Sequence, residues 1–282
     1  IAEAIAHLES LCPKRGYFTK TFCEDSRYFQ PKNGMRIDAI REGINDHYAD
    51  SPLRPILLTS LMEAADRVDS TVGLQMAYLK QWAPRAHTDL ELRIPKLTPG
   101  TGKAIRGDAE ALVQELPHVD LAYLDPPYNQ HRYFTNYHIW ETLIRWDKPD
   151  HYGVACKRVD ARDEATKSVF NKKREMPKAL TRVIHATTAD TLILSFSDEG
   201  FVPVHHLIRA CKDRGDHVEV LAFDFKRHVG HAIGIHNFHG DKVGTPGPSR
   251  NTEHLVLSGS KERIQHMVHQ ASKNTVTTPF PG

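Results

Sequence analysis

The chain has 282 residues, 40% of them apolar, which is enough to build a catalytic core together with a smaller second module. Its formal net charge of +2 neither requires nor excludes a nucleic-acid partner. No apolar run approaches bilayer length and the first residues mix Glu, His and Ser, so we expect a cytoplasmic protein without a secretory signal or a membrane span. Four cysteines without paired spacing argue against a disulfide framework.

The first part of the chain has a helical texture. Apolar residues recur at helical spacing over residues 35–45 and 55–82, and polar or proline-containing breaks separate these stretches. We therefore expect residues 1–95 to form a mostly helical module. Near its end, residues 90–97 alternate roughly as a strand does, and residues 98–102 form a Pro/Gly turn.

From there on the pattern is strand, helix, strand, helix. A short helix is expected over residues 109–116. The runs 119–124 and 191–196 are almost continuously apolar, which is typical of parallel strands buried on both faces. Between these strands, residues 161–186 predict a crossover helix that Pro177 should break or kink.

The last part of the chain completes a sheet. A helix over residues 201–214 should end at Gly215, and strands at 218–225 and 253–257 can pair antiparallel at a sheet edge. This order predicts a doubly wound α/β fold, with a catalytic domain over residues 96–275. Residues 276–282 are expected to be a disordered tail.

The most informative residues follow the strand 119–124, where Asp125, Pro126, Pro127 and Tyr128 stand in a row. Ligands of open α/β sheets bind at the carboxyl ends of the strands, so this is a candidate site. Asp-Pro is also good turn chemistry, and a neighbouring Tyr can simply cover the core. For an isolated Asp-Pro pair, the turn and core interpretation would be favoured.

Together, however, these residues suit methyl transfer to an aromatic amine. The lone pair of such an amine is delocalised into its ring, and it is freed when both amine hydrogens are held by acceptors. Asp125 supplies one acceptor, and the backbone carbonyl of Pro126 can supply the other because Pro127 restricts the backbone before it. Tyr128 offers a flat face for a base extruded from a duplex.

At these residues the sequence resembles the D12-class adenine-N6 DNA methyltransferases, whose signature is Asp-Pro-Pro-Tyr. The resemblance covers nearly the whole chain. Its downstream motifs are Tyr128-Asn129-Gln130, Tyr133, Asn136-Tyr137-His138, Gly153, Lys157-Arg158, Leu194-Ser195-Phe196-Ser197, Glu199-Gly200, Ile233-Gly234-Ile235, Gly240, Lys242-Val243-Gly244 and Arg250-Asn251. Its upstream motifs are Arg27-Tyr28-Phe29, Asn33, Ile37-Asp38, Leu61, Asp66-Arg67 and Thr71-Val72-Gly73.

The resemblance implies a Rossmann-like S-adenosylmethionine-dependent methyltransferase that acts on N6 of an adenine flipped out of double-stranded DNA, with residues 1–95 as the target-recognition module. It also implies a restriction-modification system with a restriction endonuclease, and no metal. Asp125 to Tyr128 would be catalytic. The residues expected to contact DNA are Asn129, Tyr133, Tyr137, Lys157, Arg158 and Arg250. For Lys157 and Arg158 we expect phosphate contacts, while Tyr133 and Tyr137 could equally lie in the core.

The sequence departs from this family at the cofactor. The family holds the methionine part of S-adenosylmethionine with a glycine-rich loop after a strand, and the only Gly-x-Gly here, at residues 100–102, follows Pro99 and favours a hairpin turn. We expect a segment upstream of these residues or a partner chain to supply the loop. Asp108, Ala109, Asp125 and Pro126 would form the remaining cofactor site, although Asp108 could instead be the N-cap of the helix that begins at Ala109.

Other chemistry is less favoured by the residues. Four histidines (His228, His231, His236, His239) lack Cys or acidic partners at metal-ligand spacing. Cys156 lacks the Pro-Cys pair of cytosine-C5 enzymes and is expected to be a buried thiol. Competing functions are methylation of cytosine N4, of RNA or of a protein amide, and a DNA-binding specificity subunit that needs another chain to bind the cofactor.

Overall fold

A computed structural model describes residues 1–215, 217–226, 235–236, 242–244, 250–274 and 278–279. The chain divides into two compact units. Unit 1 comprises Ile1–Gly102 and Tyr133–Thr166, and unit 2 comprises Lys103–Arg132 and Lys167–Gly282. The expected division at residue 95 thus differs from the structure in one respect. Residues Tyr133–Thr166 pack with the N-terminal helices and not with the sheet.

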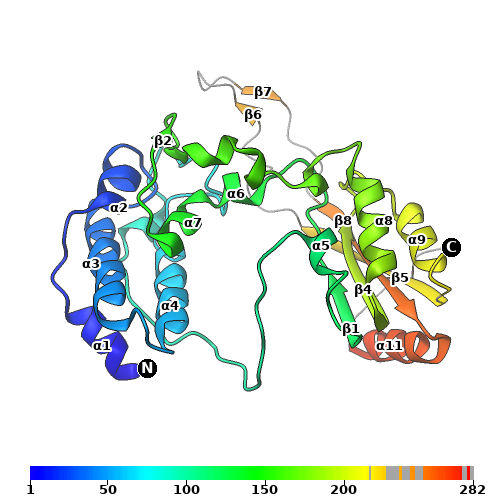
Figure 1. The fold of residues 1–282 in the computed structure, drawn as a ribbon. Helices are drawn as coiled ribbons and strands as arrows, with labels where there is room; N and C mark the ends of the chain where they lie inside the picture. The colour runs from blue at the N-terminus through cyan, green and yellow to red at the C-terminus, as the bar shows by residue number, and fades with distance from the viewer. Residues whose placement is uncertain (216, 227–234, 237–241, 245–249, 275–277, 280–282) are drawn as a thin grey trace. The chain divides into compact units, whose positions relative to one another are not determined.

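Unit 1 is mostly helical, as expected, but the helical stretch predicted over residues 55–82 ends at Asp66 (Figure 1). Its buried core is built mainly from the two long helices α3 and α4, with Ile37, Ile40, Leu57 and Leu61 fully buried. Its elements are α1 (Ala2–Ser10), α2 (Tyr17–Thr19), the π-helical turn η1 (Lys20–Glu24), α3 (Pro31–Tyr48), α4 (Arg54–Asp66), η2 (Pro84–His87), α6 (Tyr133–Asn136), α7 (His138–Arg145), β2 (His151–Tyr152), β3 (Lys157–Arg158), η3 (Val159–Arg162) and η4 (Glu164–Thr166).

Buried polar groups explain why Tyr133–Thr166 belongs to unit 1. The guanidinium of Arg41, on α3, donates to the backbone carbonyls of Leu143 (2.7 Å) and Ile144 (2.9 Å) at the end of α7. The Tyr28 hydroxyl donates to the carbonyl of Ala155 at 3.2 Å. A buried donor without a partner costs stability, so these bonds hold the segment against the N-terminal helices.

The strand predicted over residues 90–97 is wrong, although its alternating pattern corresponds to real alternation in burial. Leu90 and Leu92 are each 5% exposed and lie in the unit 1 core. Their backbone amides donate to side chains, Leu90 to Asn33 Oδ1 (3.0 Å) and Leu92 to Glu9 Oε1 (2.7 Å). The segment is therefore extended without a strand partner.

Unit 2 contains a five-stranded sheet in the order β1-β4-β8-β5-β9. β1 (Val119–Leu124) runs parallel to β4 (Ala189–Ser197), and β8 (Arg250–Gly259) inserts antiparallel between β4 and β5 (His217–Lys226). The predicted strands and the antiparallel pair near one edge are thus confirmed. In a separate small sheet, β6 (Ile235–His236) pairs antiparallel with β7 (Lys242–Gly244).

Helices cover both faces of this sheet, which is the doubly wound arrangement expected (Figure 1). On one face, α8 (Met176–Ala186) and α9 (Val204–Lys212) pack on Leu192 and Leu194 of β4. On the other face, α11 (Lys261–Asn274) buries Ile264 against Leu221 and Leu257. Gly215 follows α9 with φ of 86°, where a residue with a Cβ would be strained.

Four expectations for unit 2 need correction. The crossover segment is not one helix kinked at Pro177, because 3-10 turns, among them η5 (Val169–Asn171), precede an α8 in whose first turn Pro177 lies. The helix α5 (Ala109–Leu112) is shorter than predicted. Strand β1 is not buried on both faces, since Leu121 is 53% exposed. Of the tail, Thr278–Pro279 forms the short strand β9, and the rest lies outside the described residues.

None of the helices among the described residues has the length and the apolar composition that a membrane span requires. Of the four histidines considered above, only His236 is among the described residues.

Candidate active site

The Asp-Pro-Pro-Tyr segment directly follows β1, at the carboxyl end of the strand. Asp125 is exposed there, and Pro126 and Pro127 are half-buried. Since β4 runs parallel to β1, its own carboxyl end, with Phe196 and Ser197, lies at the same edge of the sheet. This is the position at which open α/β sheets bind ligands.

Tyr128 is held in place by the end of β4. Its ring packs edge-on against Phe196, with ring centroids 6.1 Å apart, and its backbone carbonyl accepts a hydrogen bond from the Phe201 amide at 2.8 Å. Phe196 itself is only 2% exposed. Tyr128 therefore contributes to the core and also has its ring orientation fixed next to Asp125.

A tight turn after β4 makes room for this packing. The Gly200 amide donates to the Ser197 carbonyl at 3.0 Å, and a Cβ built on Gly200 would lie 2.1 Å from Cε1 of Phe196. No real Cβ contact is this short, so any larger residue must displace the ring. Glycine at position 200 is thus needed for the Phe196 position on which Tyr128 rests.

Hydrogen bonds also fix the segment after Tyr128. The Asn129 side chain accepts from the His131 amide at 3.0 Å. The Asn171 side chain donates to the carbonyls of Asn129 (2.8 Å) and His131 (3.1 Å). Asn171 lies in the 3-10 turn η5, 42 residues from Asn129 along the chain. Only the folded chain brings the two together.

Asp108 is the N-cap of α5, as the structural alternative predicts. Its Oδ1 accepts from the amides of Glu110 (3.0 Å) and Ala111 (3.2 Å). Asp108 and Ala109 are both exposed. Because both amides use the same oxygen, the capping role does not occupy Oδ2, which can accept a bond from an amine.

Arg250 is exposed at the start of β8 and pairs with Asp224 through Nε at 2.6 Å. Beside it, the Asn251 side chain donates to Ser197 Oγ at 3.1 Å. The Arg250 guanidinium is therefore accessible to a phosphate only in competition with the Asp224 carboxylate.

The remaining candidates for DNA contact lie in unit 1. Tyr133 is 53% exposed, and its ring centroid lies 5.9 Å from that of Tyr137. Lys157 is half-buried, and this burial lowers the pKa of its ammonium. The exposed ring of Tyr133 fits a role in stacking better than a core position does.

Arg158 does not fit the expected phosphate contact. Its side chain is 2% exposed and forms bidentate pairs with Asp147 (2.7 and 2.6 Å) and Asp160 (3.0 and 2.7 Å). The same hydrogen bonds lower the pKa of the Asp147 carboxyl. Arg158 is thus a structural residue of unit 1. Cys156 beside it is 3% exposed, as expected for a buried thiol.

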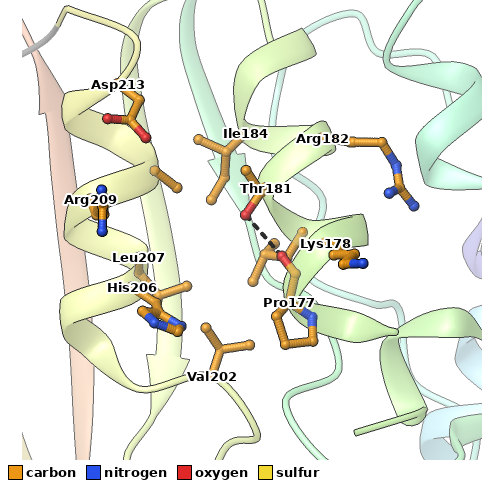
Figure 2. Close-up of a pocket in the computed structure, with 12 residues that line it drawn as sticks. Pro177, Lys178, Thr181, Arg182, Ile184, Val202, His206, Leu207, Arg209 and Asp213 are labelled. Carbon is orange, nitrogen blue, oxygen red and sulfur yellow. Dashed lines mark hydrogen bonds between the residues drawn. The ribbon is translucent and has the colours of Figure 1, made fainter. Parts of the chain in front are cut away.

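A groove of about 430 Å³ separates α8 from α9 (Figure 2). Its walls include Lys178, Arg182 and His206, and within it Thr181 donates to the Pro177 carbonyl at 2.8 Å. None of the predicted site residues lines this groove. It is therefore a feature of the helical layer and is separate from the candidate active site.

Sequence reasoning missed Asn171, Phe196 and Phe201 as supports of the site. Phe196 ends a predicted strand, so its place at the sheet edge could have been expected. Neither Asn171 nor Phe201 carries any comparable signal, because both act through contacts that are distant in sequence.

The family model of the D12 class N6 adenine-specific DNA methyltransferases matches residues 1–198. The chain belongs to this family. Its D12-class signature, Asp125 to Tyr128, lies within the matched residues and at the sheet edge described above.

Curated proteins similar to this D12-class chain are modification enzymes. The type II methyltransferase M.FokI of Planomicrobium okeanokoites is 31% identical over 194 residues, which cover 67% of this chain and 29% of M.FokI. The type II methyltransferase M.NlaIII of Neisseria lactamica is 27% identical over 235 residues, covering 80% and 68% of the two chains. The modification methylase StsI of Streptococcus sanguinis is 30% identical over 206 residues, covering 70% and 31%. The chain thus spans about a third or less of M.FokI and StsI. No solved structure matches it significantly.

Proposed function

We propose that this chain carries the catalytic segment of a DNA adenine-N6 methyltransferase that methylates an adenine flipped out of double-stranded DNA. The observation that supports this most directly is the exposed Asp125 at the carboxyl end of β1, next to a Tyr128 ring held by Phe196. Membership of the D12 class supports the same chemistry. The similarity to type II methyltransferases favours a role in restriction-modification, with a restriction endonuclease as partner.

In this proposal the carboxylate of Asp125 and the carbonyl of Pro126 accept the two hydrogens of the adenine amine. The nitrogen lone pair is then free to attack in line, and no covalent intermediate with the protein is needed. Tyr128 stacks on the base, which offsets part of the cost of taking it out of the helix. S-adenosylmethionine, when bound, supplies the methyl group as an electrophilic sulfonium.

For the cofactor, the described residues fit one end of the molecule better than the other. Oδ2 of Asp108, which the capping bonds do not use, would accept from the adenine amine of S-adenosylmethionine, and Ala109, Asp125 and Pro126 would complete this end of the site. For the methionine end, a Cβ added at Gly100 or at Gly102 would meet no atom within 4 Å, so these glycines do not form a packed cradle.

β1 is the edge strand of the sheet and one of its faces is exposed, which favours a further segment beside it. Val119, Leu121 and Tyr123 lie on one face of this strand and are 38%, 53% and 57% exposed. Parallel strands of this composition are normally covered on both faces, and exposed apolar edges are a hazard for solubility. A groove of about 520 Å³ continues this face to α11, lined by Leu121 and Met267 among others.

We infer that the segment with the glycine-rich loop adds a strand parallel to β1 and covers this groove. Polypeptide outside these 282 residues would supply it, either upstream or as a partner chain. Calorimetric titration of S-adenosylmethionine into this chain alone checks the inference. Micromolar binding by the chain alone would show that no added segment is needed.

The catalytic proposal is tested by Asp125→Asn, which keeps the shape of the side chain and removes its charge. The amide keeps one neutral and weaker acceptor oxygen and presents an N–H donor in place of the other oxygen, so the methylation rate should fall by about a hundredfold. Duplex binding should change little, since Asp125 makes no attractive phosphate contact. The assay maps N6-methyladenine in duplex DNA incubated with the active protein and labelled cofactor.

The matched control is Asp120→Asn, which removes the charge of another exposed carboxylate on β1. It should methylate like the wild type. An Asp125→Asn variant with near-normal methylation would rule out the role of Asp125, and product mapped to cytosine N4 would redefine the substrate.

A further inference from the structure

A surface loop of unit 1, residues 69–83, is closed tightly at its base. The Ser70 amide donates to the Tyr28 carbonyl at 2.8 Å. The Ser70 carbonyl accepts from the Leu79 amide at 3.0 Å, and its hydroxyl accepts from the Ala83 amide at 3.0 Å. Ser70 therefore joins both ends of the loop to the segment before α3.

Gln75 fixes the middle of the loop to the beginning of α7. Its amide donates to the Asn136 carbonyl at 2.8 Å, and its side-chain Oε1 accepts from the Ile139 amide at 2.8 Å. Its backbone carbonyl accepts from the Tyr28 hydroxyl at 2.9 Å and is 3.1 Å from Nε2 of His138. Gln75 is only 2% exposed, so the loop is held as a rigid platform.

Two cations and an aromatic ring lie together here, Lys80 and Trp82 on the loop and Arg27 on the segment before α3. The guanidinium carbon of Arg27 lies 4.7 Å from the ring centroid of Trp82, and Arg27 Nη1 donates to the Lys80 carbonyl at 2.8 Å. Lys80 and Gln81 are exposed. A guanidinium that stacks on a ring directs its remaining N–H groups outward in its own plane, where they can reach an acceptor.

Several other cations of unit 1 are paired with carboxylates. Lys14, Arg15, Arg36 and Arg85, for example, each form an ion pair with a carboxylate. Among the residues that the structure describes, neither Arg27 nor Lys80 has such a pair. Their positive charge is therefore not neutralised within the protein, and an anionic partner would neutralise it.

We propose that Arg27, Lys80 and Trp82 form a contact site for the phosphate backbone of DNA. This inference rests on the proposed function, and it names the surface of unit 1 that binds the substrate. A guanidinium held on an aromatic ring beside an exposed lysine matches the chemistry of a nucleic-acid backbone, and the rigid loop lowers the entropy lost on binding. Through Gln75 the site is also connected to the segment that carries Tyr137.

The test is the salt dependence of duplex binding by the full chain, measured by fluorescence anisotropy between 50 and 200 mM NaCl. Each phosphate contact adds about 0.9 to the slope of log K against log salt. The double variant Arg27→Ala/Lys80→Ala should therefore show a slope smaller by about 1.8. Lys80→Ala alone should show about half of this decrease in the slope. Because the exposed Lys80 side chain supports no other residue, this variant tests the proposal even if the double variant is destabilised.

The control variant Lys14→Ala/Arg15→Ala removes the same amount of charge from exposed, carboxylate-paired side chains of the same unit. Its slope should equal that of the wild type. If the Arg27/Lys80 and Lys14/Arg15 variants have equal slopes, the contact site is disproved while DNA binding stands. If the wild type binds no duplex at all, the proposed function and the contact site both fail.

Discussion

Replacement of Arg158 by Ala separates a structural role from a DNA-binding role at this residue. In the folded protein its guanidinium is almost fully buried and holds two carboxylates, those of Asp147 and Asp160. It also donates to Thr142 Oγ1 at 3.2 Å, and its guanidinium carbon lies 5.8 Å from the ring centroid of Phe134. The substitution removes all these contacts at once.

The expected loss in the free energy of unfolding follows from the burial of the Arg158 guanidinium in its two ion pairs. Removing one partner of a buried ion pair costs about 3–5 kcal/mol, because the other partner is left without its counter-charge. Asp147 and Asp160 are 37% and 30% exposed, so water can solvate them in part. We therefore expect a loss near the lower limit, about 3 kcal/mol in the free energy of unfolding.

The stabilisation should also depend on pH. Arg158 lowers the pKa of the Asp147 carboxyl below its ordinary value of 3.8, chiefly by hydrogen bonding. A carboxyl with a lowered folded-state pKa stabilises the protein above its unfolded pKa. This contribution is then lost as pH falls below 3.8 toward the folded value. In Arg158→Ala this acid-dependent loss should be smaller.

Urea denaturation followed by tryptophan fluorescence is a suitable assay, since Trp82, Trp140 and Trp146 all lie in unit 1. The control is Arg93→Ala, whose exposed guanidinium pairs with the exposed carboxylate of Glu91 in the same unit. Such pairs contribute at most about 1 kcal/mol. An Arg158→Ala protein as stable as the wild type, with a flatter salt dependence of DNA binding, would refute this reasoning and restore the phosphate contact.

Two further substitutions test one residue in each unit. Gly200→Ala tests packing in unit 2, and His138→Gln tests the titration of a buried histidine in unit 1. Gly200→Ala should cost about 1–3 kcal/mol and slow methylation, because its Cβ would displace Phe196. Gly102→Ala, which meets no atom within 4 Å, is the control, and equal melting temperatures for the two variants would contradict the packing argument. Burial lowers the pKa of His138 to about 4 from 6.5, so protons bind preferentially to the unfolded chain between these values. The wild type should thus lose about 3 kcal/mol relative to His138→Gln as pH falls from 6.5 to 4, and parallel stability curves would show that His138 titrates normally.

Local pattern was sufficient to predict the part of the fold that positions the candidate active site. The run of apolar residues that ends at Leu124 predicts β1 with its observed limits, because strand length and the prolines that follow are local properties. Asp125 to Tyr128 therefore fall at a strand end in the sequence and in the structure alike. The N-cap of Asp108 is equally local, since its partners are the next few amides.

Only the tertiary structure decided which residues these local features contact. Leu90 and Leu92 alternate in burial as a strand would, yet their amides bond to side chains of helices far earlier in the chain. The sequence suggests that Arg158 is a surface cation, but in the fold its guanidinium is buried and pairs with Asp147. The periodicity of apolar residues indicates which side chains are buried, but it does not show which residues they contact. Charge placement and the assignment of Tyr133–Thr166 to unit 1 depend on that partner, because buried polar groups are stable only where a complementary group meets them.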